Sequence, residues 1–208
     1  MKNKNIIPLF LIFLMFVAGF LLYDNVPDKL PIHWDSNGSP DGYGSKFTAL
    51  FLLPIITLGM YFFLLIVPYI AVYKKNIKSF FLYYYGIKLS LVIFMGLLYI
   101  FSIIQIFKPL NMNYLMMPLV FSFFLVLGYF IRKTKRNYFV GIRTPWTLAS
   151  ENNWKKTNKV GGYAMQGLGV FAIISMFLTR PIIVFFIGIV LYVIFIFGYS
   201  YGQYKKEL

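Results

Sequence analysis

The sequence predicts an all-α, polytopic integral membrane protein with six transmembrane helices and with both termini in the cytoplasm. Three observations predict this fold class: the composition, the number of long apolar stretches, and the uneven distribution of lysine and arginine between them. Hydrophobic residues make up 60% of the 208 residues and charged residues 12%, whereas a soluble domain carries about a quarter charged residues. A chain this apolar cannot bury its surface in its own core, so the bilayer must act as part of its solvent.

A helix that crosses a bilayer needs about 20 mostly apolar residues. The sequence offers six such stretches, at residues 6–23, 47–73, 87–107, 114–131, 162–179 and 181–202. The first stretch follows Lys2 and Lys4, as in a secretory signal, but no small-x-small cleavage site follows it, so we expect an uncleaved helix. The last two stretches meet at Arg180-Pro181, which predicts a tight external turn between antiparallel helices.

The orientation follows from the positive charges, because lysine and arginine gather on cytoplasmic loops. With the N-terminus inside, 15 of the 20 fall in inner segments and 4 in outer segments, and Lys88 lies near the inner end of a helix, where its side chain can snorkel. The net charge of +14 is therefore a topology signal, and we expect contact with the lipid bilayer and no direct binding of nucleic acid. The prediction is one membrane domain over 1–208 in the bacterial cytoplasmic membrane, with a long outer loop at 24–46 and a long cytoplasmic loop at 132–161.

The outer loop is rich in turn-forming residues. Asn37-Gly38 and Asp41-Gly42 are turn signals, so we expect a folded-back loop anchored at the outer interface by aromatic side chains. A calcium site built on Asp35, Asn37 and Asp41 is the weaker reading, because the distant bidentate glutamate is absent and the spacing does not fit. His33 is open to a structural, a partner-contacting or a proton-transfer role. The candidate ligand-binding residues are Pro31, His33, Trp34, Asp35, Asp41, Tyr43 and Lys46.

The cytoplasmic loop predicts a short interfacial helix. Thr144-Pro145 is a good helix start, with threonine as N-cap and proline at the first position, and Glu151 is expected early in the same helix. Gly161-Gly162 predicts a break before the fifth span, and Trp146 and Trp154 are expected at the lipid headgroups. An amphipathic connector and a specific contact site are both possible. Arg143 is expected to pin the loop to carbonyl groups or to a phosphate.

The inventory of reactive groups argues against an enzyme. The chain has no cysteine and one histidine, and no aspartate or glutamate falls in a predicted span. The sequence contains neither an HExxH nor a GxSxG motif. We therefore expect no catalytic residues, no metal site and no cofactor. Polar residues within the spans are few, which disfavours a proton-coupled transporter.

Two motifs resemble those of one known family. The string GIRTPWTL at 141–148, followed by Glu151 and Trp154, resembles the signature of the SdpI family of bacterial immunity proteins, and PIHWDSNGSPDGYGSK at 31–46 resembles the loop after their first helix. The inner signature is matched by Gly141, Arg143, Thr144, Pro145, Trp146, Thr147, Leu148, Glu151 and Trp154, and the outer pattern by Pro31, Trp34 and Lys46. Asn158 departs from the family, in which many members carry histidine.

The resemblance implies a membrane immunity protein. Such a protein protects the producing cell against a secreted membrane-active killing peptide, the sporulation-delaying-protein toxin in the family's best-known case. It implies in addition a receptor that holds a cognate cytoplasmic winged-helix repressor at the membrane, with the inner signature as the reporting or partner-contacting segment. The alternatives are a small-solute or peptide transporter or channel, or an envelope-stress membrane protein without a toxin ligand.

Overall fold

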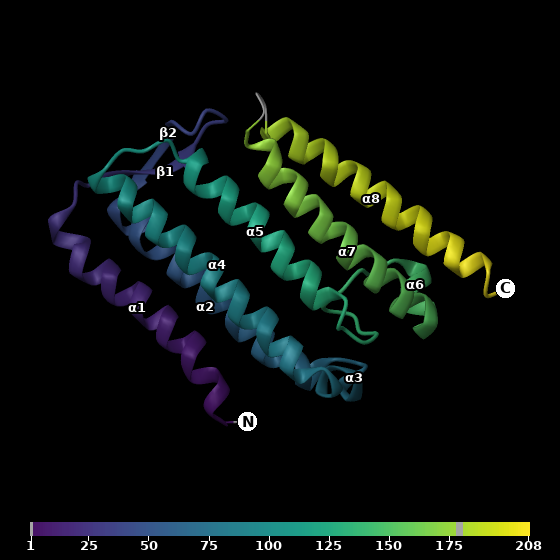
Figure 1. The fold of residues 1–208 in the computed structure, drawn as a ribbon. Helices are drawn as coiled ribbons and strands as arrows, with labels where there is room; N and C mark the ends of the chain where they lie inside the picture. Colours follow the sequence, from purple (N-terminus) through teal and green to yellow (C-terminus); the bar gives the residue numbers. More distant parts are fainter. Residues whose placement is uncertain (1, 178–180) are drawn as a thin grey trace. The chain divides into compact units, whose positions relative to one another are not determined.

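The structure is a computed structural model and describes residues 2–177 and 181–208. Figure 1 shows its elements, which are helices apart from one pair of short strands. Contacts divide the chain into two compact units, Met1–Leu64 with Lys88–Leu119 and Leu65–Ile87 with Val120–Leu208. Each unit is described separately below.

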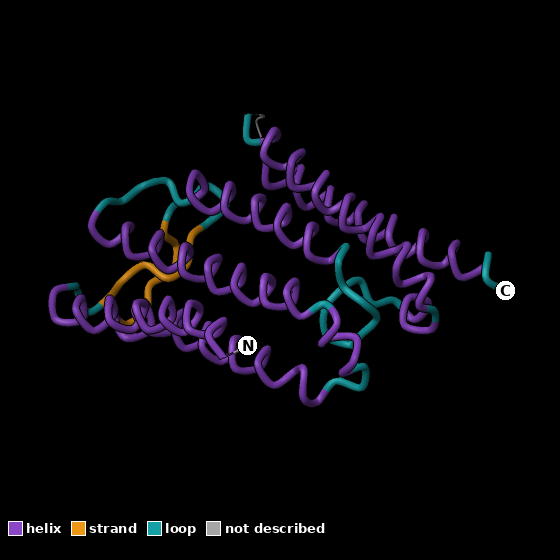
Figure 2. The backbone as a smooth tube through the Cα atoms, turned by 60° about the horizontal axis from the view of Figure 1, so that its bottom comes forward, coloured by secondary structure: helices purple, strands orange, loops and turns teal. Residues whose placement is uncertain are grey.

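The first unit consists of helices and a β-hairpin, which connects its first two long helices. Its helices are α1 (Ile6–Leu22), flanked by the 3₁₀ turns η1 (Lys2–Asn5) and η2 (Tyr23–Asn25), together with most of α2 (Lys46–Ile70) and α4 (Phe81–Phe107) and the start of α5 (Asn113–Ile131). Strands β1 (Lys29–Trp34) and β2 (Pro40–Ser45) pair antiparallel between α1 and α2 and are orange in Figure 2. A small apolar core of Val26, Leu30, Leu50 and Phe51 joins the hairpin to these helices.

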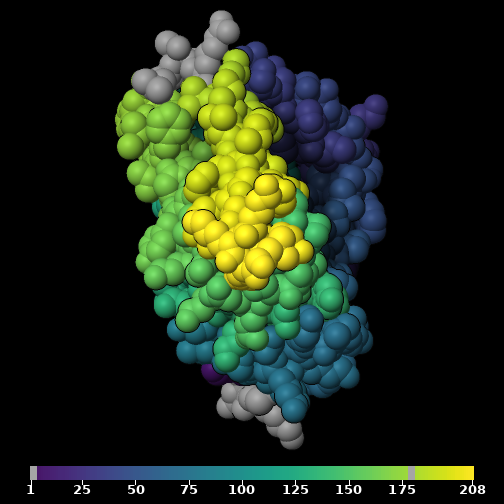
Figure 3. All heavy atoms as spheres, turned by 90° about the vertical axis from the view of Figure 1, so that its right-hand side faces the viewer, coloured from purple at the N-terminus to yellow at the C-terminus, as the bar shows by residue number. Residues whose placement is uncertain are grey.

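The second unit holds the helices around the cytoplasmic-loop motif. It comprises the end of α2, α3 (Lys74–Ser79), the start of α4, the rest of α5, α6 (Pro145–Ala149), α7 (Glu151–Ser175) and α8 (Pro181–Lys205). Helices α6, α7 and α8 pack on one another. Figure 3 shows the C-terminal residues of α8, in yellow, against green residues of the same unit.

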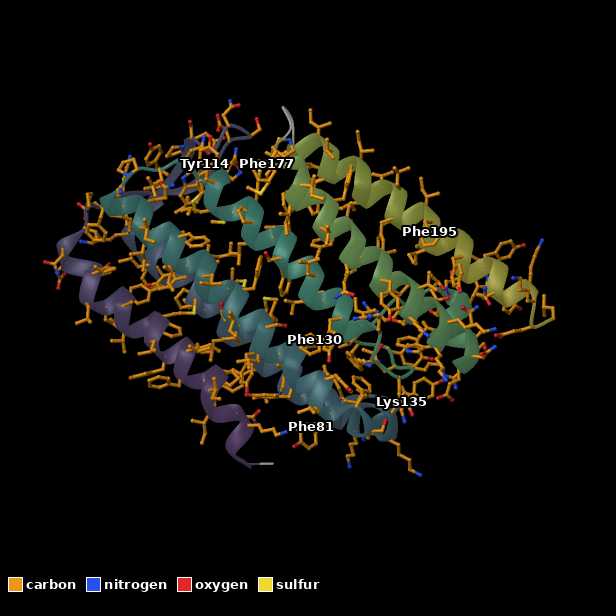
Figure 4. All side chains as sticks on the ribbon, in the orientation of Figure 1. Phe81, Tyr114, Phe130, Lys135, Phe177 and Phe195 are labelled. Atoms are coloured by element: carbon orange, nitrogen blue, oxygen red, sulfur yellow. The ribbon has the colours of Figure 1, made fainter. Side chains whose placement is uncertain are left out.

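Five helices are long and apolar enough to cross a membrane: Ile6–Asn25, Lys46–Ile70, Phe81–Phe107, Asn113–Ile131 and Pro181–Lys205. Large apolar side chains stand exposed along them, such as Phe195 on α8, which is 47% exposed (Figure 4). Exposed apolar surface on this scale is typical of contact with lipid. The chain is therefore a multi-pass, helical membrane protein, as predicted.

Helix α7 is not among those five, because its first half is polar, so the sixth span remains a prediction. The predicted turn at Arg180-Pro181 includes residue 180, which lies outside the described residues.

The predicted helix break at Gly161-Gly162 is wrong, because α7 continues through both glycines. A Cβ atom on Gly162 would lie 2.5 Å from the carbonyl oxygen of Gly128 on α5, and one on Gly128 would lie 2.5 Å from the Gly162 oxygen. Gln166 strengthens this crossing, since its Nε2 donates to the Leu125 oxygen over 3.1 Å. Small residues at helix crossings let two backbones approach closely in membranes. The glycines therefore serve packing.

Lys88 was predicted to snorkel outward, and this prediction is wrong. Its side chain is buried, with the residue 2% exposed, and Nζ lies 3.3 Å from Oδ1 of Asn5, to which it donates. The Tyr61 hydroxyl donates to the same oxygen over 3.1 Å, and the Lys88 ammonium lies 5.3 Å from the centre of the Tyr61 ring. The prediction failed because Asn5, 83 residues away in sequence, supplies a polar partner inside the unit.

Candidate functional site

The outer loop forms a β-hairpin with a tightly bonded turn. The Asp35 carboxylate accepts the backbone N–H groups of Asn37 and Ser39, each over 2.9 Å, and the Asp35 N–H donates to the Ser39 oxygen. The bond from the Ser39 N–H is the main reason why the pKa of Asp35 lies below its usual value. Gly38 has φ +80°, a conformation that glycine adopts without strain. The turn predicted at Asn37-Gly38 is confirmed.

The second predicted turn, at Asp41-Gly42, is wrong, because both residues lie within β2. Gly42 pairs with His33, and the register shifts on either side of His33. The His33 Nδ1 lies 2.5 Å from Oδ1 of Asp41, so these two candidate residues form a cross-strand pair at the surface. Pairing with β1 overrides the turn preference of the Asp41-Gly42 dipeptide.

Residues at the start of α5 and directly before it hold the hairpin turn in place. The side-chain amides of Asn111 and Asn113 donate to the oxygens of Asn37 and Ser36, each over 2.8 Å. The Met112 N–H donates to the Gly38 oxygen over 3.0 Å. A Cβ on Gly38 would collide with the Asn111 side chain. The turn is thus fixed at three backbone carbonyls, and a hairpin fixed in this way can present a rigid surface to a ligand.

All seven outer candidate residues lie on or directly after this hairpin. Pro31, His33 and Trp34 are on β1, Asp35 is in the turn, Asp41 and Tyr43 are on β2, and Lys46 begins α2. Lys46 forms an ion pair with Asp28 over 3.2 Å and lies 4.8 Å from the centre of the Tyr23 ring. Tyr43 is largely exposed. The residues are therefore brought together, and their role in ligand binding stays a prediction.

The cytoplasmic motif begins with the predicted helix cap. The Thr144 hydroxyl accepts the Thr147 N–H, and the Thr147 hydroxyl accepts the Thr144 N–H, so the two threonines form a reciprocal capping box with Pro145 at the first position. Glu151 was expected in this helix, which is wrong. Helix α6 ends at Ala149, Ser150 caps α7, and Glu151 is the first residue of α7, where its charge suits the helix dipole.

Trp154 lies at the centre of the motif instead of at the lipid headgroups, so that prediction is also wrong. It is 1% exposed, and its Nε1 donates to the Thr134 oxygen over 3.1 Å. Gly141 has φ +124°, and a Cβ there would lie 2.7 Å from the Trp154 ring. The indole therefore packs where only glycine leaves room, and it ties α7 to the chain that follows α5.

Asn158 clasps the same loop from the next turn of α7. Its Oδ1 accepts the Ile142 N–H over 2.7 Å, and its Nδ2 donates to the Ile142 oxygen over 3.3 Å and to the Trp154 oxygen over 3.0 Å. One side chain thus bonds to both backbone groups of Ile142, whose oxygen also accepts the Thr147 hydroxyl over 3.0 Å. The position at which this chain departs from the family pattern is a structural anchor of the motif.

The remaining residues of the motif bind it to neighbouring chain. Arg143 is exposed, and its Nη1 donates to the Tyr138 oxygen, in keeping with the predicted carbonyl contact. The Trp146 ring lies 5.1 Å from that of Tyr201 on α8. Arg136 donates to the oxygens of Leu148 and Ala149 at the end of α6. The motif is therefore a packed module, which disfavours the reading as a plain amphipathic connector.

Sequence reasoning missed the asparagines that organise this module. Asn137 is fully buried, accepts the N–H groups of Phe139 and Val140 and donates to the Lys135 and Val140 oxygens. Asn153 donates to the Ser200 oxygen on α8 over 2.9 Å. The one available signal was the number of uncharged amides within a strongly basic stretch. In the part of the chain that the structure describes, no cluster of three or more histidine, cysteine, aspartate or glutamate residues could hold a metal.

Comparisons with known proteins find one family match within each of the two units. Residues 133–200 match the model of the SdpI/YfhL protein family, and residues 10–58 match a domain of unknown function (DUF1648). The first range includes the motif with α6, α7 and most of α8, and the second includes most of α1, the hairpin and the start of α2.

A curated relative covers both ranges. The chain is 29% identical over 216 residues to the protein named "Immunity protein SdpI" from Bacillus subtilis (strain 168), covering 98% of this chain and 97% of the relative. No solved structure matches the chain. The family match and this end-to-end similarity confirm the resemblance to SdpI-family proteins that was inferred from the two motifs.

Proposed function

We propose that this chain is an immunity protein of the bacterial cytoplasmic membrane that protects its cell against a secreted, membrane-active peptide. The observation that carries the proposal is the similarity to the SdpI immunity protein along nearly the whole of both chains. The protein acts by binding and not by catalysis. The lack of cysteine and the single, surface-exposed histidine support this part of the proposal.

The proposed topology has six spans, with the hairpin outside and the α6–α7 motif in the cytoplasm. The distribution of lysine and arginine supports it, with 15 in the inner and 4 in the outer segments. Helix α7 is the sixth span. Its 25 residues extend about 37 Å, its second half is apolar, and it packs along α8. Both termini then lie in the cytoplasm.

The proposed outer site is the hairpin, which would meet a peptide arriving from outside the cell. Exposed polar and aromatic side chains fixed on a rigid scaffold support this assignment, because a binding surface that is ordered beforehand loses less entropy on binding. Trp34 is the main candidate for an anchor, since tryptophan is enriched among the residues that dominate binding energies.

The proposed inner site is the surface around Arg143, which reports toxin binding to a cytoplasmic winged-helix repressor. Exposed lysines surround the motif, among them Lys133, Lys135, Lys155, Lys156 and Lys159. A basic surface of this kind can dock an acidic face of a soluble protein. Helix α5 provides the physical link, because it begins at the segment that clamps the hairpin and ends at the chain that accepts the Trp154 indole.

Killing assays test the immunity function. A sensitive bacterium that expresses the chain is exposed to a panel of secreted antimicrobial peptides, detergents and ionophores. We expect protection against one hydrophobic peptide and no protection against the other agents. Equal protection against all agents would indicate a general envelope-stress role, and no protection against any agent would leave the immunity function without support.

Substitutions test the separation of the two sites. Trp34→Ala should weaken peptide binding together with both protection and reporting, whereas Arg143→Ala should leave binding intact and weaken reporting. Membrane abundance, measured by immunoblot, is the control for each variant. If Arg143→Ala removes the protein from the membrane, the motif is purely structural and the reporting role is wrong. Trp146→Ala is less selective, because it also loses packing on Tyr201.

A further inference from the structure

An aromatic pocket lies between α1 and α2, next to the base of the hairpin. Its volume is about 360 Å³, and its lining includes five aromatic residues and one acid: Phe16, Phe20, Tyr23, Asp24, Phe47 and Phe51. The Phe51 ring is the centre of the cluster, with ring centres 4.9 Å away at Phe20 and 5.3 Å away at Phe47. A pocket of this size accommodates one or two large apolar side chains.

Asp24 is the one charged group that lines this pocket. It lies in η2, at the C-terminal end of the first candidate span, and is exposed. Within residues 2–177 and 181–208 its carboxylate has no ion pair and no hydrogen bond, whereas Asp28 pairs with Lys46, Asp41 with His33 and Asp35 with backbone N–H groups. Asp24 is therefore available to a ligand.

The surroundings favour a cation at this carboxylate. Residues 24–46 contain four aspartates and two lysines, a net charge of −2 in a chain whose net charge is +14. Aromatic rings attract cations through their faces, most strongly where water is excluded. The pocket thus combines an apolar lining, aromatic walls and a carboxylate that has no partner among the described residues.

We propose that this pocket binds a peptide through a bulky apolar side chain flanked by a lysine, an arginine or a free N-terminal amine, with the cation at Asp24. The inference rests on the proposed function, because it takes the ligand to be the secreted peptide, and it adds the site and the chemical class. A lipid with an amine headgroup has similar chemistry but would not distinguish one toxin from another.

The position of Phe51 favours a peptide over a lipid. Phe51 lines the pocket and also belongs to the small core that contains Leu30 of β1 and Val26. A side chain that fills the pocket therefore contacts a residue on which the hairpin rests. The hairpin turn is bonded in turn to residues at the start of α5 and directly before it. Occupancy of the pocket is coupled in this way to the surface that a peptide would meet outside.

The test measures binding to the full-length protein in nanodiscs of phosphatidylcholine, which carries no primary amine. Because the native chain has no cysteine, Asn25→Cys labelled with a small fluorophore reports on the mouth of the pocket. The probes are two acetylated, amidated helical peptides of leucine, alanine and phenylalanine that differ in one terminal residue, lysine or glutamine. Asp24→Asn is the test variant, Asp24→Glu retains the charge, and Asp28→Asn is the matched control, which removes an equal charge four residues away.

We expect saturable binding in which the lysine peptide binds about fivefold more tightly than the glutamine peptide, the preference of one interfacial ion pair. Asp24→Asn should abolish the preference, and Asp24→Glu and Asp28→Asn should retain it. Equal affinities for the two peptides, or no saturable response, would overturn the proposal. If added phosphatidylethanolamine gives the response and suppresses that of the lysine peptide, the pocket is a lipid site and the proposal is wrong.

The killing assay separates this inference from the proposed function. If Asp24→Asn protects cells as well as the wild type does, the pocket is not the toxin site, and the immunity function stands. Binding of the lysine peptide that depends on Asp24, in a protein that protects against no peptide, would support the site and refute the immunity function.

Discussion

Replacing the buried Asn158 by alanine should destabilise the α6–α7 module far more than replacing the exposed Asn152 on the same helix. Asn158 is 1% exposed and is bonded to both backbone groups of Ile142, at 2.7 Å and 3.3 Å. Alanine preserves the helix and removes the side-chain hydrogen bonds to Ile142. The Ile142 N–H is then left without the acceptor that it has in the native module, in a region where water does not easily replace it.

The magnitude follows from the lost bonds. Each intramolecular hydrogen bond contributes about 1 kcal/mol net, and a buried donor left without a partner costs a further 1–3 kcal/mol or so. The lost bond from the Ile142 N–H and the orphaned donor together give a loss of about 3 kcal/mol. The Ile142 oxygen loses less, because it keeps the Thr147 hydroxyl at 3.0 Å. The additional bond to the Trp154 oxygen contributes less, because that carbonyl lies within α7, where the helix backbone provides its usual partner.

The assay is unfolding of the purified protein in mixed micelles by increasing SDS, followed by tryptophan fluorescence. Two of the three tryptophans, Trp146 and Trp154, lie in the module, so the signal reports on its opening. Asn152→Ala is the matched control on the same helix. Asn152 is exposed, and among the described residues its side chain bonds only to Glu207, over 2.8 Å. Its loss should therefore change the free energy of unfolding by less than about 0.5 kcal/mol.

A result in which both alanine variants unfold within about 0.5 kcal/mol of the wild type would refute the reasoning. It would mean that the Ile142 N–H finds another partner or that the loop is not part of the cooperative unit. A large effect of Asn152→Ala with a small one of Asn158→Ala would contradict the assigned burial directly.

Three further outcomes are expected. Gly162→Leu should lower the free energy of unfolding by at least about 2 kcal/mol, because its Cβ collides with the α5 backbone, whereas Gly167→Leu, which meets open space, should be nearly neutral in the same titration. The pKa of Asp35 is depressed, so its carboxylate stabilises the turn fully at pH values above its ordinary pKa of 3.8. This stabilisation is lost as the pH falls through the lower pKa of the folded state, and the NMR shift of the Ser39 amide should report the loss. In intact cells, an impermeant thiol reagent should label Ser39→Cys and not Lys156→Cys, and the reverse pattern would overturn the topology.

The sequence predicted those parts of the fold that depend on local composition. Five of the six apolar stretches correspond to helices that can span a bilayer, because length and hydropathy alone decide whether a segment partitions into lipid. The start of α6 was predicted for the same kind of reason, since its cap involves Thr144 and Thr147, three residues apart. The Asn37-Gly38 turn is similarly local.

The hairpin strands were not predicted, and their composition explains why. Strand β2 reads Pro-Asp-Gly-Tyr-Gly-Ser, and proline, aspartate and glycine are depleted in strands. The strand forms because β1 pairs with it and because Asn111 and Asn113 hold the turn from more than 70 residues away. Strand preference reflects context more than intrinsic backbone preference, so a pattern read along one segment could not have found these strands.

The errors at Gly161-Gly162, Lys88 and Trp154 share one physical cause. In each case the local rule is correct for an isolated segment: glycine weakens a helix, a lysine near a membrane surface snorkels, and tryptophan prefers the interface. In each case a partner distant in sequence reverses the outcome, by backbone contact at Gly128, by the Asn5 oxygen, or by the Thr134 oxygen. Tryptophan is buried where its N–H finds an acceptor. It follows that unexplained polar and small residues within an apolar chain indicate internal contacts before they indicate function, and that Asp24, which has no such contact among the described residues, is a stronger functional candidate than the buried Lys88.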